Sequence, residues 1–147
     1  MDDLSAKDGK TRWVLVVDDD PGVVVTLGEV LEKGGFRPLF AHTASEAKTK
    51  LRNQLFDCII TDMCLGNGSG EDVILEVRSD KHGLNRRTPI LVISAFLDAD
   101  LVARIKPDVN GILVKPFKIA SMIERICSVI LPEEVPSESR EILRKTI

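Results

Sequence analysis

The sequence has little cysteine and no long hydrophobic run, and both absences exclude classes of protein. Its cysteines are odd in number and form no CxxC pair, which argues against the disulfide framework of a small secreted protein. No apolar run approaches the roughly 20 residues of a membrane-spanning helix. The first residues lack the basic and apolar regions of a signal peptide. We therefore expect a cytoplasmic protein with no membrane contact.

The chain also lacks a strong excess of charge of either sign. Lys and Arg number 20 against 23 Asp and Glu, a net charge of -3 that gives no general attraction to nucleic acid. Hydrophobic residues make up 44% and charged residues 29% of the sequence, a mixture that argues against wholesale disorder. With 147 residues, the chain can form one domain with a real core, whereas two would be cramped.

Five short apolar runs alternate with segments of helical pattern. The runs are too short for helices and rich in β-branched residues, which is typical of buried strands. This alternation predicts an α/β fold, a doubly wound, five-stranded parallel sheet with helices on both faces. In the flavodoxin-like strand order 2-1-3-4-5, the first and third strands are neighbours. The predicted strands cover residues 13–17, 36–40, 58–61, 89–93 and 112–114, and the predicted helices follow Asp20, Thr43 and Ser69 and cover 98–106 and 118–130.

Polar side chains stand where the predicted strands end. Asp18 and Asp19 follow the first strand, and Asp62 ends the third. Ser94 follows the fourth strand and Lys115 the fifth. Because the carboxyl ends of parallel strands meet at one edge of the sheet, we expect these five side chains to converge there.

Such a cluster has a specific electrostatic requirement. Two carboxylates about 4 Å apart repel each other by roughly 4 kcal/mol at an effective dielectric constant of 20. Lys115 supplies one compensating charge, and an all-oxygen site of this kind suits Mg²⁺. A metal ion, Lys115 and the Ser94 hydroxyl together could stabilise a phosphoryl group. Asp62 would then act as a nucleophile and form an acyl phosphate.

The motifs at these strand ends resemble those of the receiver domain (CheY-like) of two-component response regulators. They are Val16-Val17-Asp18-Asp19-Asp20-Pro21, Asp62 with Gly70 eight positions on, Ser94-Ala95, and Lys115-Pro116-Phe117. The resemblance covers roughly residues 12–131. Residues 1–11 would then be a flexible lead-in, and residues 132–147 a linker or C-terminal tail. The protein would be either a stand-alone receiver or a piece of a longer regulator or hybrid kinase.

The resemblance implies a role for each site residue. Asp62 would accept a phosphoryl group from a phosphohistidine of a sensor histidine kinase or histidine phosphotransfer protein. Asp19, Asp62 and the main-chain carbonyl of Cys64 would bind Mg²⁺, with Asp18 helping through water. Ser94 and Lys115 would contact the phosphoryl group, and the Lys115–Pro116 peptide would be cis. Such a protein is a signalling phosphoacceptor rather than an enzyme in the ordinary sense.

The resemblance also implies an output surface, and the sequence departs from the family pattern near it. The signal would reach a downstream domain or protein through the face of the fourth helix, fifth strand and fifth helix, without direct binding of nucleic acid, and a homodimer is left open. Family members commonly have Tyr or Phe where this chain has Ile112, and the chain has no tyrosine at all. Phe96 stands two residues after Ser94, where it can screen the site from water, and we hypothesise that it slows loss of phosphate.

Three alternatives compete with this interpretation. A hydrolase with an aspartyl nucleophile, of the haloacid-dehalogenase kind, would carry its nucleophile after the first strand and more acids after the lysine. A flavin-binding module would need a Ser/Thr-rich loop where this chain has Asp18, Asp19 and Asp20. A pseudo-receiver, which folds but is never phosphorylated and acts as an interaction module, is the strongest of the three.

Overall fold

The structure, a computed structural model, describes residues 10–65, 68–80, 83–96 and 98–130, so most of the predicted lead-in and tail lies outside the described residues. The described residues form five strands and five α-helices in alternation, with one short 3-10 turn. In chain order they are β1 (Arg12–Val17), α2 (Pro21–Lys33), β2 (Phe36–Ala41), α3 (Ala44–Asn53), β3 (Cys58–Asp62), α4 (Gly70–Ser79), β4 (Ile90–Ser94), α5 (Ala99–Ile105), the turn η1 (Lys106–Asp108), β5 (Gly111–Val114) and α6 (Ile119–Ile130).

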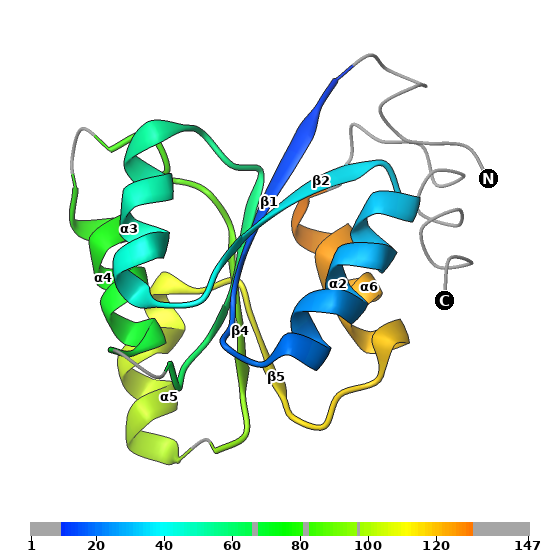
Figure 1. Cartoon of the computed structure of the whole chain (residues 1–147). Helices are drawn as coiled ribbons and strands as arrows, with labels where there is room; N and C mark the ends of the chain where they lie inside the picture. The colour runs from blue at the N-terminus through cyan, green and yellow to red at the C-terminus, as the bar shows by residue number, and fades with distance from the viewer. Residues whose placement is uncertain (1–9, 66–67, 81–82, 97, 131–147) are drawn as a thin grey trace.

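The strands form one parallel sheet in the order β2-β1-β3-β4-β5, which confirms the predicted fold class. Figure 1 shows α2 and α6 on one face of the sheet and α3, α4 and α5 on the other. The register aligns the strand ends, since Val17 pairs with Thr61 and Ser94 with Val114. The residues that follow β1, β3, β4 and β5 therefore lie along one edge, which we call the carboxyl edge.

The alternation of side chains along β1 divides the core into two layers. Val14 and Val16 pack with the apolar residues of α2 and α6 on one face. Leu15 and Val17 pack with those of α3, α4 and α5 on the other. All four are fully buried, as expected for a central strand with helices on both sides.

Side chains cap the helices that begin near the carboxyl edge. Asp20 accepts a hydrogen bond from the Gly22 N–H at 2.9 Å and caps α2 ahead of Pro21, at the start of the helix predicted to follow it. Ser69 caps α4 in a reciprocal capping box with Asp72. The predicted helix over residues 98–106 is one residue shorter at each end, and the turn η1, which contains Pro107, follows it directly.

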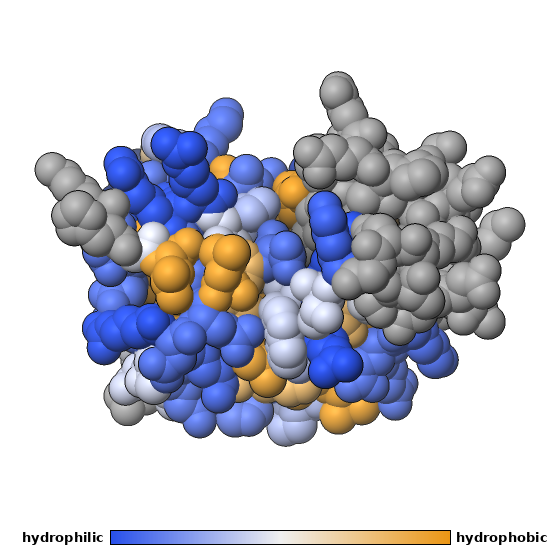
Figure 2. All heavy atoms as spheres, turned by 90° about the horizontal axis from the view of Figure 1, so that it is seen from above, coloured by the Kyte–Doolittle hydropathy of each residue, from blue (hydrophilic) through white to orange (hydrophobic). Residues whose placement is uncertain are grey.

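The opposite edge of the sheet carries the loops that lead into the strands. Figure 2 looks onto this edge and shows a small hydrophobic patch surrounded by polar side chains. Leu55 and Leu84, in the loops before β3 and β4, are among the exposed hydrophobic residues of the chain. None of the described helices is long and apolar enough to cross a membrane.

Candidate functional site

Three carboxylates meet at the carboxyl edge. One oxygen from each of Asp18, Asp19 and Asp62 lies within 4.8 Å of the others. Asp18 is completely buried and Asp62 nearly so, whereas Asp19 is exposed. The cluster arises because β1 and β3 are adjacent parallel strands, so the sheet order brings together residues that are more than 40 positions apart in the sequence.

Lys115 supplies the positive charge that this cluster needs. It follows β5, and its Nζ lies 2.9 Å from Asp62 Oδ2 and 3.1 Å from Asp18 Oδ2. Its own N–H donates to the Ser94 carbonyl at 2.8 Å, and its peptide bond to Pro116 is cis. The structure thus brings four of the five predicted side chains into one polar cluster, and the fifth, Ser94, ends the strand beside it.

Burial and neighbouring charges shift the pKa values of Asp18 and Lys115. Burial raises the pKa of Asp18, and the nearby Asp62 adds to this, although the Asp20 N–H and Lys115 oppose it. Burial by itself lowers the pKa of Lys115, but the two carboxylates outweigh burial and raise it. Lys115 is therefore held as a cation between two acids.

Asp62 is fixed on several sides. Its Oδ1 accepts a hydrogen bond from the Cys64 N–H at 3.1 Å while its Oδ2 accepts one from Lys115. The Thr61 hydroxyl donates to the Asp62 carbonyl at 3.0 Å. A Cβ added to Gly70 would stand 2.2 Å from that same carbonyl oxygen, so only glycine fits there. This close approach explains on steric grounds why the residue eight positions after Asp62 is a glycine.

The donor set fits a magnesium ion. All of the available side-chain ligands are carboxylate oxygens, the ligand type that Mg²⁺ prefers, and Asp19 keeps one side of the cluster open to water. Asp18 Oδ2 is buried without a hydrogen-bond partner, despite its proximity to Lys115, so it retains capacity for a further positive or donating group. Cys64 lies in the turn after β3, where it forms an isolated bridge with Ser69, and its carbonyl stays a predicted ligand.

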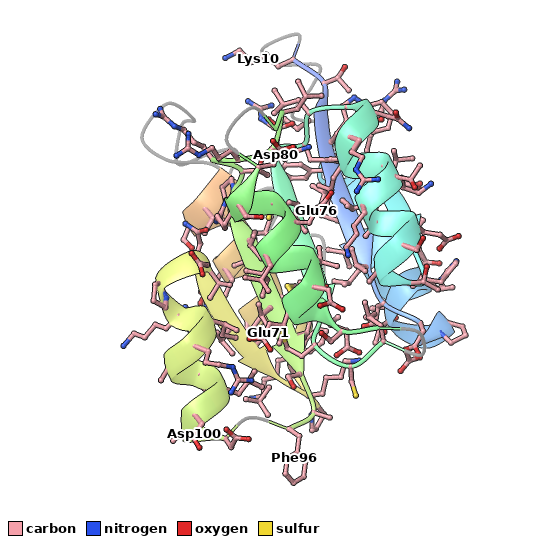
Figure 3. The ribbon with its side chains drawn as sticks, turned by 90° about the vertical axis from the view of Figure 1, so that its left-hand side faces the viewer. Lys10, Glu71, Glu76, Asp80, Phe96 and Asp100 are labelled. Atoms are coloured by element: carbon pink, nitrogen blue, oxygen red, sulfur yellow. The ribbon has the colours of Figure 1, made fainter. Side chains whose placement is uncertain are left out.

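Ser94 and Phe96 are bonded to each other rather than to the acids. The Ser94 hydroxyl donates to the Phe96 carbonyl at 2.7 Å and accepts from the Phe96 N–H at 3.2 Å. Ser94 is buried, but the Phe96 side chain is 87% exposed and points away from the molecule, as Figure 3 shows. In this conformation Phe96 does not screen the site. Ile112, in place of the usual aromatic residue, is half-buried against the core beneath α5.

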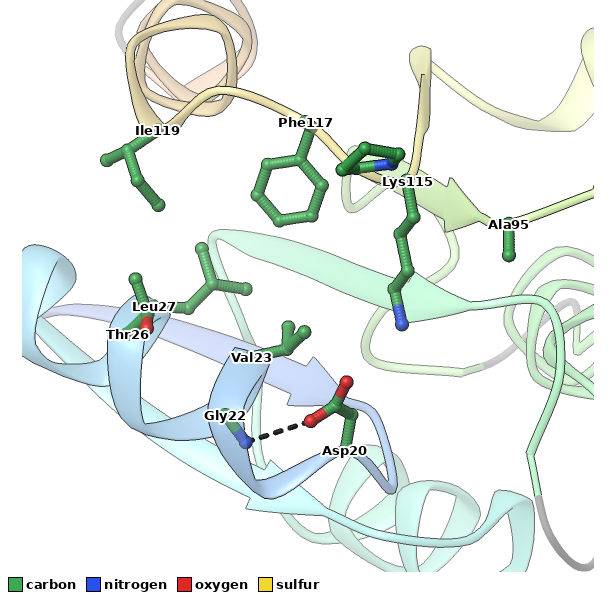
Figure 4. A pocket seen from close by; sticks show the side chains of 10 residues that line it. Asp20, Gly22, Val23, Thr26, Leu27, Ala95, Lys115, Phe117 and Ile119 are labelled. Atoms are coloured by element: carbon green, nitrogen blue, oxygen red, sulfur yellow. Dashed lines mark hydrogen bonds between the residues drawn. The ribbon is translucent and has the colours of Figure 1, made fainter.

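Two features near the site have no counterpart in the sequence predictions. The Arg104 Nε of α5 lies 3.1 Å from Glu71 Oε2 in the first turn of α4, so this ion pair links α5 to α4. A pocket of about 630 Å³ opens beside Lys115, between α2 and the loop that leads to α6 (Figure 4). Neither could be found from sequence patterns, because each joins segments that are far apart in the chain.

The family follows from comparison with known proteins. The sequence model of the family described as "Response regulator receiver domain" matches residues 14–127, which is most of the chain. The chain belongs to the receiver-domain family. The resemblance of its strand-end motifs is thereby confirmed, and the hydrolase and flavin-module alternatives fall away.

Similar receiver-containing proteins are found among bacterial regulators. The DNA-binding response regulator MtrA of Mycolicibacterium smegmatis is 31% identical over 120 residues, which cover 81% of this chain and 50% of MtrA. The sensor histidine kinase AruS of Pseudomonas aeruginosa is 34% identical over 91 residues, 61% of this chain and 9% of AruS. The receiver domain thus spans about half or less of these relatives.

Solved receiver domains superimpose well on this one. The non-phosphorylated receiver domain of HemR from Leptospira biflexa is 28% identical with a TM-score of 0.76, covering 86% of this chain and 99% of that one. The receiver domain of the sensor histidine kinase PA1611 from Pseudomonas aeruginosa is 25% identical with a TM-score of 0.72, covering 82% and 98%. The PA1611 structure holds a magnesium ion in its active-site cleft.

Proposed function

We propose that this receiver domain accepts a phosphoryl group on Asp62 from a phosphohistidine of a sensor histidine kinase or histidine phosphotransfer protein. The observation that carries the proposal is the Lys115 ammonium, which bridges Asp62 and Asp18 at the open edge of the sheet. A lysine held between two buried acids, beside a third that is exposed, is suited to receive a group that carries further negative charge.

The transfer itself is a simple displacement. An Asp62 carboxylate oxygen attacks phosphorus, the new O–P bond forms, and the N–P bond of the phosphohistidine breaks with its electron pair left on the imidazole nitrogen. Lys115 stays charged because of its raised pKa and stabilises the equatorial oxygens of the phosphoryl group. The Ser94 hydroxyl, at the end of the adjacent strand, donates to another of these oxygens once it turns toward the site.

The residues that would hold Mg²⁺ are Asp19, Asp62 and the Cys64 carbonyl, with Asp18 acting through water. When bound, the ion would neutralise charge on the carboxylates and on the phosphoryl oxygens. The buried Asp18 Oδ2 without a hydrogen bond supports this assignment, because it marks negative charge that Lys115 alone does not fully satisfy.

The pocket beside Lys115 supports docking of the donor protein at the same edge. Its walls include Val23 and Leu27 of α2 and Phe117 and Ile119 beyond Lys115 (Figure 4). An apolar side chain of the donor that fills this pocket would bring its phosphohistidine to the side of Lys115 and Asp62. The walls are mostly apolar and the charged groups lie at one end, an arrangement similar to the apolar core and polar rim of a protein interface.

For output we propose the face of α5, β5 and α6. The strand β5 is an edge strand of the sheet, and its Val114 is 52% exposed. An edge strand with an exposed apolar residue offers both backbone and side-chain contacts to a downstream domain, a separate protein or a second copy.

Intact mass spectrometry after incubation with acetyl phosphate tests the proposal. We expect a gain of one phosphoryl group with Mg²⁺, none with EDTA, and none in Asp62→Asn. The control is Asp57→Asn, because Asp57 is an exposed aspartate whose Oδ2 accepts from the Trp13 N–H, away from the site. No gain under any condition, including with a phosphorylated histidine donor, would favour the phosphorylation-independent interaction module.

A further inference from the structure

Phe96 is the most exposed large hydrophobic residue in the described part of the chain, and a pocket lies beside it. Its side chain is 87% exposed, whereas the other large exposed hydrophobic residues reach at most 60%. The pocket has a volume of about 240 Å³, and Met63, Glu71 and Leu101 line it together with Phe96. A cavity of about 150 Å³ is already enough to hold benzene. The space beside Phe96 is therefore large enough for its ring.

The hydroxyl of Ser94 is hydrogen-bonded to both main-chain polar groups of Phe96 and so fixes the backbone turn that carries the exposed ring. It donates its proton to the Phe96 carbonyl and accepts from the Phe96 N–H, at 2.7 and 3.2 Å. A serine hydroxyl has one proton to donate. It can give this proton to the Phe96 carbonyl or to a phosphoryl oxygen on Asp62, but not to both. Binding of the phosphoryl group by Ser94 therefore ends the bond that fixes the residue 94–96 turn.

The chain lacks the aromatic ring that could respond to this event from β5. Ile112 is half-buried on β5, and the sequence contains no tyrosine. Phe96 is bonded directly to Ser94 and already forms one wall of the apolar pocket between Met63 and α5. Burial of an exposed phenyl ring favours the closed position once the turn is released.

We propose that Phe96 is the conformational switch of this receiver, held out by Ser94 in the unphosphorylated state and released into the pocket against Met63 and Leu101 when Ser94 binds the phosphoryl group. The inference rests on the proposed phosphorylation of Asp62. In the closed position the ring contacts α5 at Leu101 and covers the side of the site next to Met63. The pocket is bounded by Glu71, which pairs with Arg104, so closure also reaches the link between α4 and α5.

Fluorine NMR of the protein labelled with 4-fluorophenylalanine tests this inference. The chain has five phenylalanines, and loss of one resonance in Phe96→Leu assigns the signal of residue 96. Without ligand, a soluble paramagnetic chelate should broaden this signal strongly, because the ring is exposed. With Mg²⁺ and beryllium fluoride, a phosphoryl analogue, we expect the signal to become protected, while those of the buried Phe36 and Phe56 stay unchanged.

Two variants separate a switch from a passive change. Ser94→Ala removes the hydroxyl in both states, so the Phe96 signal should no longer respond to the analogue. Leu101→Gln makes the pocket polar, so the ring should stay exposed with the analogue bound.

In a separate measurement, Phe96→Ala should shorten the lifetime of the phosphorylated protein several-fold, whereas Leu75→Ala, at an exposed apolar position on α4, should leave it unchanged.

The outcomes distinguish failure of the switch from failure of the proposed function. Bound beryllium fluoride gives its own fluorine resonance, which reports occupancy independently of the ring. If the site is occupied and Phe96 remains as accessible as before, the switch is wrong and the phosphoacceptor role stands. If the analogue does not bind and neither acetyl phosphate nor a phosphorylated histidine donor adds mass, the proposed function is wrong, and the proposed switch is wrong with it.

Discussion

At the scale of single residues, the three carboxylates of the site differ in environment although they are the same chemical group. Asp18 is buried and carries a raised pKa, Asp62 is buried but bonded to Lys115 and to the Cys64 N–H, and Asp19 faces solvent. The positions of the three residues in the sequence do not reveal these differences in burial and bonding. The environments follow from which strand each residue ends and which neighbour that strand has.

The raised pKa of Asp18 predicts a specific pH dependence of stability. The folded state binds this proton more tightly than the unfolded state does, which favours folding below pH 3.8, and that contribution is lost as the pH rises through the raised value. In buffer without Mg²⁺, the stability of Asp18→Asn relative to the wild type should therefore rise as the pH increases through this window. Urea unfolding at a series of pH values checks this, and a difference independent of pH would contradict it.

Gly70 predicts a steric effect. Gly70→Ala would place a methyl group 2.2 Å from the Asp62 carbonyl oxygen, which forces the backbone at Asp62 to move. We expect a loss of about 2–3 kcal/mol in the free energy of unfolding and slower phosphorylation. Gly22→Ala is the matched control, because its nearest neighbour would be 3.3 Å away, on a side chain. Equal effects of the two changes in urea unfolding would rule out the close approach as the cause.

At the scale of elements, one buried side chain joins the segments that lead into β3 and β4. Asn85 accepts from the Phe56 N–H at 2.7 Å and donates to the carbonyls of Leu51 and Gln54 at 2.9 and 2.8 Å. Thr88 adds a hydrogen bond to the Asn85 amide oxygen at 3.0 Å. This network closes the end of α3 against the loop before β4, on the edge opposite the site.

Loss of the hydrogen bonds of Asn85 should lower the stability of the fold. Asn85→Ala leaves buried backbone groups without partners, so we expect it to lower the free energy of unfolding by about 2–4 kcal/mol. Asn53→Ala, at the exposed end of α3, should change it by less than about 0.5 kcal/mol. Denaturant unfolding of both variants provides the comparison, and a mild effect of Asn85→Ala would show that water replaces the lost bonds.

The elements themselves were largely predictable from the sequence. Apolar runs such as Trp13–Val17 and caps such as Asp20 and Ser69 depend on neighbours within a few positions, which a sequence pattern records. The bond between Ser94 and Phe96 and the pair of Glu71 with Arg104 depend on side-chain orientation or on tertiary approach, which no pattern records. The proximity of Asp18 and Asp62 is also tertiary, but it was predictable, because the strand order expected from local patterns places the two residues at the ends of neighbouring strands.

At the scale of the whole molecule, Mg²⁺ should stabilise the fold through the carboxylate cluster. At a free concentration ten times its dissociation constant, a ligand that binds only the folded state adds about 1.4 kcal/mol, a rise of about 3–6 °C in Tm. Asp19→Asn should remove this response, and Asp20→Asn, which keeps the helix cap, should retain it. Thermal unfolding with and without Mg²⁺ checks this, and equal responses of the two variants would contradict the assignment of Asp19.

Chemical localisation of the acyl phosphate distinguishes Asp62 from the other aspartates as the residue that receives the phosphoryl group. Borohydride reduces a phosphorylated aspartate to homoserine, which peptide mass spectrometry can place in the sequence. After treatment with acetyl phosphate and Mg²⁺, we expect homoserine at position 62 and at no other aspartate, with none formed when Mg²⁺ is chelated. Homoserine at Asp18 or Asp19, or at none of the three positions despite a gain in mass, would show that Asp62 does not receive the phosphoryl group.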